Sequence, residues 1–360
     1  MSEEIYRKLA QRLDTIPNGF SPTESGSELR LLAKLFTPKE AALASVMRLG
    51  REPAADIAAR IGIDASVAQR TLEEMVRKRL IEARKKDGRF TFGLIPFAYG
   101  FYEHQLPWMD VELATLFEEY YVETRGGASI SAGPAINRVI PVEEAVPTDI
   151  EIFPYERATE LIEGAKSWSV RDCICRVQQE LVGKGCDHPV KNCIGFAPVE
   201  NAFEHSVAGR AISKQEALRI LSEAEEAGLV HSTGNYRDGQ FYVCNCCTCS
   251  CGFLRAIAEL GIPTAMARSD FNAAVEVSEC IGCEDCVERC QFGALSVPED
   301  VCEVDYARCV GCGVCVSTCT SDALRLERRS EGETPPLPAN NREWTAWRAQ
   351  ERGISMADIL

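Results

Sequence analysis

Several sequence features that are typical of large functional classes are missing from this sequence. Histidine occurs only 4 times among 360 residues, which disfavours a hydrolase whose metal is held by histidines. No apolar run approaches about 20 residues, the length that crosses a bilayer, so we expect no membrane insertion. The sequence has no phosphate-binding loop, no dinucleotide-binding glycine fingerprint and no nucleophile elbow. It therefore predicts neither a catalytic residue nor a small-molecule substrate.

Positive charge is also scarce relative to negative charge. The chain has 39 Lys+Arg and 54 Asp+Glu, which gives a formal net charge of −15. Such an acidic chain is a poor overall ligand for nucleic acid or for an anionic membrane. The initial segment, MSEEIYRKLAQRLD, is charged and lacks the apolar core of a secretory signal. The expected location is therefore the cytoplasm.

Cysteine is absent before residue 173 and abundant after it. The 18 cysteines fall into three groups: four between Cys173 and Cys193, five between Cys244 and Cys251, and nine between Cys280 and Cys319. A reducing cytosol disfavours disulfides, and clustered intracellular cysteines at short spacing more often bind metal. The cysteines are therefore the candidate functional residues.

The third cysteine group contains an internal repeat. The pattern C-x2-C-x2-C-x3-C occurs twice, and equivalent positions such as Gly282 and Gly311 are offset by 29 residues. The two runs consist of Cys280, Cys283, Cys286 and Cys290, and of Cys309, Cys312, Cys315 and Cys319. Three cysteines on one turning loop can reach three irons of a cubane, and the fourth thiolate must come from elsewhere. The pattern favours iron–sulfur clusters over zinc.

Residues 276–327 resemble the bacterial-type ferredoxin with two [4Fe-4S] clusters. The resemblance implies a ferredoxin-like module in which each run lends its last cysteine to the other cluster. It implies one cluster on Cys280, Cys283, Cys286 and Cys319, and a second on Cys309, Cys312, Cys315 and Cys290. The family usually has proline after the fourth cysteine, whereas Gln291 and Thr320 stand here, so hydrogen bonding to the sulfurs is expected to differ. Cys302 lies outside the pattern and is predicted to be a small core residue.

The cysteine-rich middle domain, residues 166–275, has no spacing that fixes how its cysteines are shared among sites. Its nine cysteines are Cys173, Cys175, Cys186, Cys193, Cys244, Cys246, Cys247, Cys249 and Cys251. A third [4Fe-4S] cluster, two further clusters, structural zinc (Zn), and a redox-active dithiol at Cys246 and Cys247 all remain open. At least one additional metal site is expected. His188 could be a ligand, but a surface histidine is the favoured interpretation.

The rest of the sequence predicts an α+β multidomain chain. Residues 1–100 form an N-terminal domain, residues 101–165 a connecting segment, and residues 328–360 a linker and tail that ends in a short helix. An acidic helix is expected at 112–123, an extended connection at 126–147, and a capped helix at 213–228.

Within the N-terminal domain, helices are expected to begin near Thr37, Pro53 and Asp64. A charged turn at Lys85-Lys86-Asp87-Gly88 then indicates a hairpin. Three helices followed by a short hairpin resemble a winged helix-turn-helix domain.

The N-terminal domain is the one basic part of the chain. Residues 30–100 carry 14 basic and 8 acidic residues. Residues 64–90 could bind DNA, with the third helix in the major groove, the turn on phosphate, and Ser66, Gln69 and Arg70 facing base edges. The more ordinary interpretation, which we favour, is a winged helix used for packing or partner docking.

Together these patterns predict a cytoplasmic iron–sulfur electron-transfer protein, an accessory subunit or carrier for a larger redox enzyme rather than a catalyst. Similar cysteine-rich segments stand upstream of dicluster ferredoxin modules in proteins of anaerobes. Residues 270–327 carry 12 acidic and 3 basic residues, so this surface should dock on a basic face of a redox partner. The alternative is a redox-sensing transcriptional regulator. An enzyme with its active site among Cys173–Cys251 would need an open iron coordination position.

Overall fold

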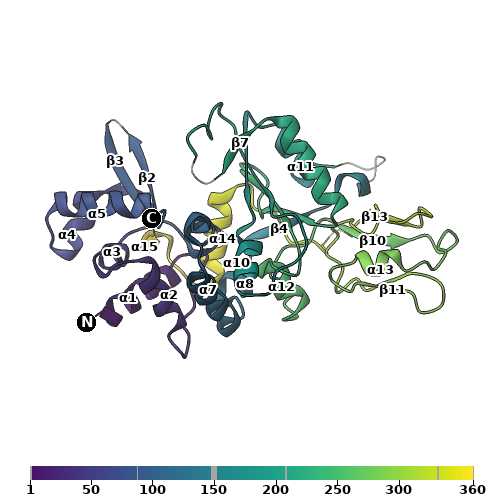
Figure 1. The fold of residues 1–360 in the computed structure, drawn as a ribbon, viewed down its shortest axis with the longest axis horizontal. Helices are drawn as coiled ribbons and strands as arrows, with labels where there is room; N and C mark the ends of the chain where they lie inside the picture. Colours follow the sequence, from purple (N-terminus) through teal and green to yellow (C-terminus); the bar gives the residue numbers. More distant parts are fainter. Residues whose placement is uncertain (1, 87, 147–151, 207–208, 331, 360) are drawn as a thin grey trace. The chain divides into compact units, whose positions relative to one another are not determined.

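The computed structural model describes residues 2–86, 88–146, 152–206, 209–330 and 332–359 (Figure 1). Asp87 of the predicted turn and Pro147 at the end of the predicted connection lie outside the described residues. The chain forms two compact units, one of residues 1–133 with 345–360 and the other of residues 134–344. These units are larger than the segments expected from sequence, and the segment 101–165 is divided between them. None of the described helices is both long and apolar enough to cross a membrane.

The first unit contains the three helices and the hairpin expected from sequence. They are α3 (Pro38–Ala44), α4 (Ala54–Ile61), α5 (Ala65–Arg77), β2 (Ile81–Lys86) and β3 (Arg89–Leu94). Thr37 and Glu40 form a reciprocal capping box at α3, and the Asp64 carboxylate accepts from the backbone of Ser66 and Val67 at α5. A short strand, β1 (Glu52–Pro53), pairs with β3 and completes a three-stranded antiparallel sheet of order β1-β3-β2.

Further helices enclose the core of the first unit. They are α1 (Ser2–Asp14), α2 (Ser27–Leu35), α7 (Val111–Thr124) and the short elements η1 (Phe97–Phe101), α6 (Tyr102–His104), η2 (Leu106–Trp108) and α8 (Gly127–Ser131). The acidic helix expected at 112–123 is confirmed as α7. Phe20, Phe36 and Phe101 are almost fully buried and pack edge-on or stacked with other rings, so aromatic packing dominates this core.

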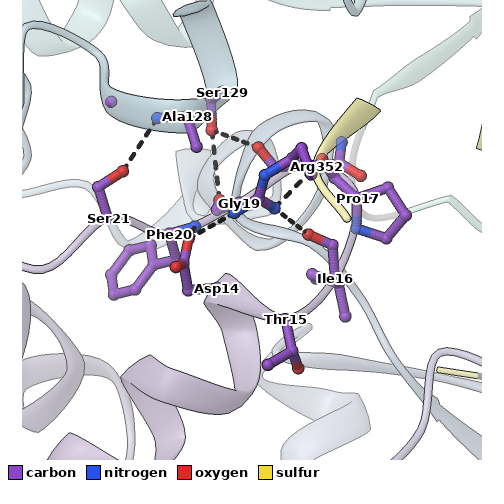
Figure 2. Close-up of polar contacts among 12 residues, drawn as sticks. Asp14, Thr15, Ile16, Pro17, Gly19, Phe20, Ser21, Ala128, Ser129 and Arg352 are labelled. Carbon is purple, nitrogen blue, oxygen red and sulfur yellow. Dashed lines mark hydrogen bonds and ion pairs between the residues drawn. The ribbon is translucent and has the colours of Figure 1, made fainter. Parts of the chain in front are cut away.

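The C-terminal tail is held in the first unit by two arginines. It contains α14 (Asn341–Glu351) and α15 (Met356–Ile359), which confirms the helix expected after the linker. Arg348 is 0% exposed and donates to the carbonyl oxygens of Pro17, Ala128, Ser129 and Ala132. Figure 2 shows Arg352, which donates to the carbonyl of Ile16 at 2.5 Å and pairs with Asp14 at 2.9 Å. Burial lowers the pKa of Arg348 to about 9.

The second unit is built on a six-stranded antiparallel sheet of order β4-β8-β9-β6-β5-β7. The strands are β4 (Asn137–Ile140), β5 (Ser167–Asp172), β6 (Lys191–Ala197), β7 (Arg210–Ile212), β8 (Val230–Gly234) and β9 (Tyr242–Cys246). Helices α9 (Ala158–Glu163) and α11 (Lys214–Glu226) bury their apolar faces on this sheet with Val170, Ile194 and Val243. Ser213 caps α11 as expected, accepting from the backbone of Glu216.

The remaining elements of the second unit carry the cysteines or lie beside them. They are η3 (Glu143–Ala145), η4 (Pro154–Glu156), α10 (Ile174–Leu181), α12 (Gly252–Ala258), α13 (Asp285–Arg289), and the strands β10 (Phe271–Val275), β11 (Leu295–Ser296), β12 (Glu303–Val304) and β13 (Leu324–Arg328). β10 pairs with β13 and β11 with β12, both antiparallel. Within this unit these four strands and α13 lie together (Figure 1).

Candidate metal centres

The sheet registers bring the start of one cysteine run beside the end of the other. Val275 of β10 pairs with Leu324 of β13; Cys280 follows Val275 by five residues and Cys319 precedes Leu324 by five. Leu295 of β11 pairs with Val304 of β12 in the equivalent way, so Cys290 and Cys309 each lie five residues from a paired position. Because antiparallel pairing fixes which residues face each other, the fourth cysteine of each run is placed at the other run.

Four cysteines of the two runs line a first cavity. Three come from the first run and one from the second: Cys280, Cys283, Cys286 and Cys319. Cys302 lines the same cavity, is buried as predicted, and places its Sγ 3.6 Å from that of Cys286. We call this the outer cavity, because Cys283 is exposed to solvent.

Four other cysteines line a second cavity. Three come from the second run and one from the first: Cys309, Cys312, Cys315 and Cys290. Cys309 and Cys315 are buried, and Cys290 and Cys312 are half-buried. We call this the inner cavity. The two sets of four match the ligand sets that the ferredoxin resemblance implies.

The segment between the two runs presents backbone amides to two sulfurs of the first run. The amide of Cys302 donates to Cys280 Sγ at 3.3 Å, and the amide of Ala294 donates to Cys290 Sγ at 3.4 Å. Gly282 and Gly311 have φ of 67° and 71°, a left-handed conformation that favours glycine. Donors aimed at sulfur stabilise a thiolate, so these loops are suited to anionic ligands.

The surroundings of the two cavities differ. Around the outer cavity, Val277 and Ile281 are 62% and 67% exposed, and Glu279, Glu284 and Asp285 are exposed beside them. Around the inner cavity, Phe292 and Val310 belong to an apolar cluster that Cys290 and Cys312 also contact. The same cluster includes Cys246 and Cys251 of the middle cysteine groups. Thus the outer cavity faces solvent and the inner cavity faces the other cysteines.

Six of the middle cysteines form a continuous chain of thiol contacts, which we call the six-thiol group. In order of contact they are Cys173, Cys175, Cys251, Cys246, Cys244 and Cys193. Cys244 and Cys246 lie two residues apart on β9, so they share one face of the sheet. Cys173 and Cys251 precede α10 and α12 as N-cap residues. Hydrogen bonds from Cys193 and Cys246 lower the pKa of Cys244 to about 6.

Two arginines supply positive charge to these thiols. Arg171 Nε donates to Cys193 Sγ at 3.3 Å. Arg176 is 3% exposed and donates to three uncharged oxygens, the carbonyls of Pro189 and Asn245 and Asn192 Oδ1. Burial lowers the pKa of Arg176, but negative charge on Cys173 and Cys247 outweighs it and raises the pKa. The charge of Arg176 favours the thiolates of Cys173 and Cys247, although the hydrogen bond with Cys175 and burial raise the pKa of Cys173 overall, and burial raises that of Cys247.

The three other middle cysteines gather with His188 into a group that could hold a metal ion. The group, which we call the Cys3His group, consists of Cys186, His188, Cys247 and Cys249, whose ligand atoms all lie within 4.8 Å of one another. His188, for which a surface position is the favoured interpretation, has a half-buried ring beside three thiols, and its role as a ligand stays a prediction. Cys246 and Cys247 fall into different groups, which argues against the dithiol interpretation.

Gln291, which stands where the ferredoxin family has proline, connects these sites. Its Oε1 accepts from the amide of Thr248 at 2.7 Å, and its Nε2 donates to the carbonyl of Gly228 at 2.5 Å. Arg289 reinforces the contact by donating to the carbonyls of Glu225 and Glu226. The side chain after Cys290 therefore fixes the end of the first run to the segment that carries Cys247 and Cys249.

The sequence patterns alone assign no role to Arg171, Arg176 or Gln291. Each adjoins a cysteine motif in the sequence, and that adjacency is the signal that could have marked it. Comparisons of the chain with protein-family models, with curated proteins and with solved structures give no match. The geometry of the cysteines is therefore the main guide to function.

Proposed function

We propose that this protein transfers electrons through iron–sulfur clusters, with one [4Fe-4S] cluster in the outer cavity and one in the inner cavity. The observation that carries the proposal is that each cavity is lined by four cysteines of the repeated pattern, three from one run and one from the other. A cubane takes four thiolates, and each cluster accepts and returns one electron. The chain itself supplies the thiolates, the amide donors to sulfur and the apolar walls that set the potential.

The six-thiol group is proposed to hold a third iron–sulfur cluster. It gathers six cysteines, more than the four that a cubane needs, and Arg176 places a buried positive charge beside Cys173 and Cys246. Cys246 and Cys251 share an apolar cluster with Cys290 and Cys312 of the inner cavity. This adjacency supports a route in which electrons pass between the inner cluster and the six-thiol group.

The outer cavity is proposed to be the port for a redox partner. Val277 and Ile281 offer exposed apolar surface, and exposed acidic residues surround Cys283. A partner with a basic rim around its own redox centre would complement this surface, and its association would slow as salt screens the charges. On this proposal the protein is a carrier or an accessory subunit rather than a catalyst.

The test is the iron and acid-labile sulfide content of protein purified without oxygen, followed by reduction with a low-potential donor. We expect about 12 iron per chain, or about 8 if the six-thiol group holds no cluster. The reduced protein should return its electrons to an acceptor, one for each cluster. Zinc at the eight ferredoxin-like positions, or clusters that cannot be reduced, would overturn the proposal.

A second candidate function, redox-controlled DNA binding, is favoured by one feature of the first unit. Exposed basic residues lie on α5 and on the hairpin of β2 and β3: Arg70, Arg77, Arg84, Lys85 and Arg89. Lys78, in contrast, places its Nζ 2.8 Å from the buried carboxylate of Glu40, and so stabilises the capping box of α3. A gel-shift or anisotropy screen of genomic fragments, with clusters oxidised and reduced, tests this candidate.

A further inference from the structure

We propose that the Cys3His group binds a single zinc ion, separate from every iron–sulfur cluster. This inference goes beyond the electron-transfer function and does not depend on it. Three thiolates and one imidazole are among the ligand sets of structural zinc sites.

The spacing of the ligand atoms is that of a mononuclear site. Four ligands of one tetrahedral zinc with Zn–S of about 2.3 Å stand about 3.8 Å apart. The Sγ atoms of Cys186 and Cys247 are 3.9 Å apart, and all four ligand atoms lie within 4.8 Å of one another. Ligands of a cubane bind different irons at separate corners, so they stand farther apart. Among the described residues, no set of three or more from the two cavities or the six-thiol group meets the 4.8 Å limit.

His188 has a nitrogen ready for a metal. Its Nδ1 atom is buried and has no hydrogen-bond partner among the described residues. A buried ring nitrogen without a partner is costly, and a metal bond would remove that cost.

The charges around the group also balance. Zinc with three thiolates and a neutral imidazole carries one net negative charge. The buried guanidinium of Arg176 lies beside Cys247, so its positive charge offsets that negative charge. Ser250 Oγ lies 3.6 Å from Cys186 Sγ and can donate to it. Arg176 and Ser250 thus contact the ligand atoms from outside, as the residues around metal sites commonly do.

The site would join two segments that are far apart in sequence. Cys186 lies between α10 and β6, and Cys247 follows β9, 61 residues later. In the sequence, Cys247 and Cys249 lie between members of the six-thiol group, with Cys244 and Cys246 before them and Cys251 after them. A zinc ion here would therefore fix the segment that supplies half of the six-thiol group.

The experiment measures zinc and iron together on the intact, anaerobically purified chain. We expect one zinc per chain, and zinc-edge X-ray absorption should show three sulfurs at about 2.3 Å and one nitrogen at about 2.0–2.1 Å. The variants His188→Gln and Cys249→Ser should lose most of the zinc while the iron content stays unchanged. The exposed His205 provides the matched control, because His205→Gln should keep both metals.

Other results would overturn the proposal. Absence of zinc, a zinc site of four sulfurs, or loss of about 4 iron from His188→Gln would each assign these residues differently. Because X-ray absorption is measured on the unmodified protein, a variant that fails to fold leaves the test intact. Failure of the electron-transfer proposal would instead appear as missing or irreducible iron with zinc still present.

Discussion

Replacing Cys290 tests the crossed arrangement of ligands most directly. Cys290 belongs to the first run in sequence, yet it lines the inner cavity with Cys309, Cys312 and Cys315 of the second run. We expect Cys290→Ala to remove about 4 iron, or about 1 iron if a three-iron cluster survives, from the inner cavity alone. The outer cavity keeps its four cysteines, so its cluster should remain and give the magnetic resonance spectrum of an isolated reduced cluster.

Double variants show which cysteines share a cluster through the number of iron atoms that each pair loses. If Cys290 and Cys309 serve one cluster, then Cys290→Ala with Cys309→Ala should lose the same cluster, about 4 iron, and no more. If Cys286 serves the other cluster, then Cys286→Ala with Cys290→Ala should lose about 8 iron. The assay is iron and sulfide per chain on anaerobic protein, with the spectrum of the reduced form as a second readout.

The opposite pattern of losses would refute the reasoning. Should each run bind its own cluster, the pair Cys286 and Cys290 would cost about 4 iron and the pair Cys290 and Cys309 about 8. That outcome would also show that the pairings of β10 with β13 and of β11 with β12 do not determine the ligands. Cys302→Ala serves as the control, because Cys302 contacts the outer cavity but belongs to neither ligand set.

Three further predictions concern contacts that support these sites. Gln291→Ala removes hydrogen bonds to Thr248 and Gly228 and should destabilise the second unit by about 1–3 kcal/mol, measured by urea unfolding of the iron-loaded chain. Arg348→Met leaves four carbonyl oxygens without their buried donor and should cost the first unit at least about 1–3 kcal/mol, whereas Gln350→Ala, at an exposed position on the same helix, should change the unfolding midpoint little. If α5 binds DNA, the double change Arg70→Ala and Arg77→Ala should weaken binding at least tenfold and flatten its salt dependence. Gln291→Ala or Arg348→Met with the unfolding curve of the unmodified protein would contradict the first two predictions. Unchanged DNA affinity of the double arginine variant would contradict the third.

The local elements of the first unit are predictable from sequence because each has a chemical start signal. At α3 the cap is formed by Thr37 with Glu40, and at α5 by Asp64. These side chains accept hydrogen bonds from backbone amides of the first helical turn, so the signal spans only three or four residues. The docking of the tail is not predictable in the same way. Arg348 reaches carbonyls more than 200 positions away, and a surface-like Arg in a helix gives no sign of full burial.

The same distinction between local and distant contacts applies to the cysteines. The repeat of 29 residues is visible in the sequence, and the ligand sets that the ferredoxin resemblance implies agree with the cysteines that the sheet pairings bring to each cavity. The middle cysteines carry no repeat, so their partition depends on the sheet that brings Cys193 of β6 beside Cys244 of β9. For the same reason the sequence patterns do not show that His188 lies near Cys247 and Cys249, since these cysteines are about sixty residues away.

The dense run Cys244-Asn245-Cys246-Cys247-Thr248-Cys249-Ser250-Cys251 has a physical explanation in this arrangement. A strand sends alternate side chains to opposite faces, so Cys244 and Cys246 share the face of the six-thiol group. Cys247 then begins the turn toward Cys186. The turn then returns the chain to Cys251 at the start of α12, which rejoins the six-thiol group. One short segment thus serves two centres. If zinc holds Cys247 and Cys249 in place, removing it should loosen Cys246 and Cys251 as well. Without a challenge the iron content should stay unchanged, but on exposure to oxygen zinc-depleted protein should lose the proposed third cluster faster than zinc-loaded protein, while the clusters proposed for the two cavities persist. Equal rates of loss for all three would show that the segment does not couple them.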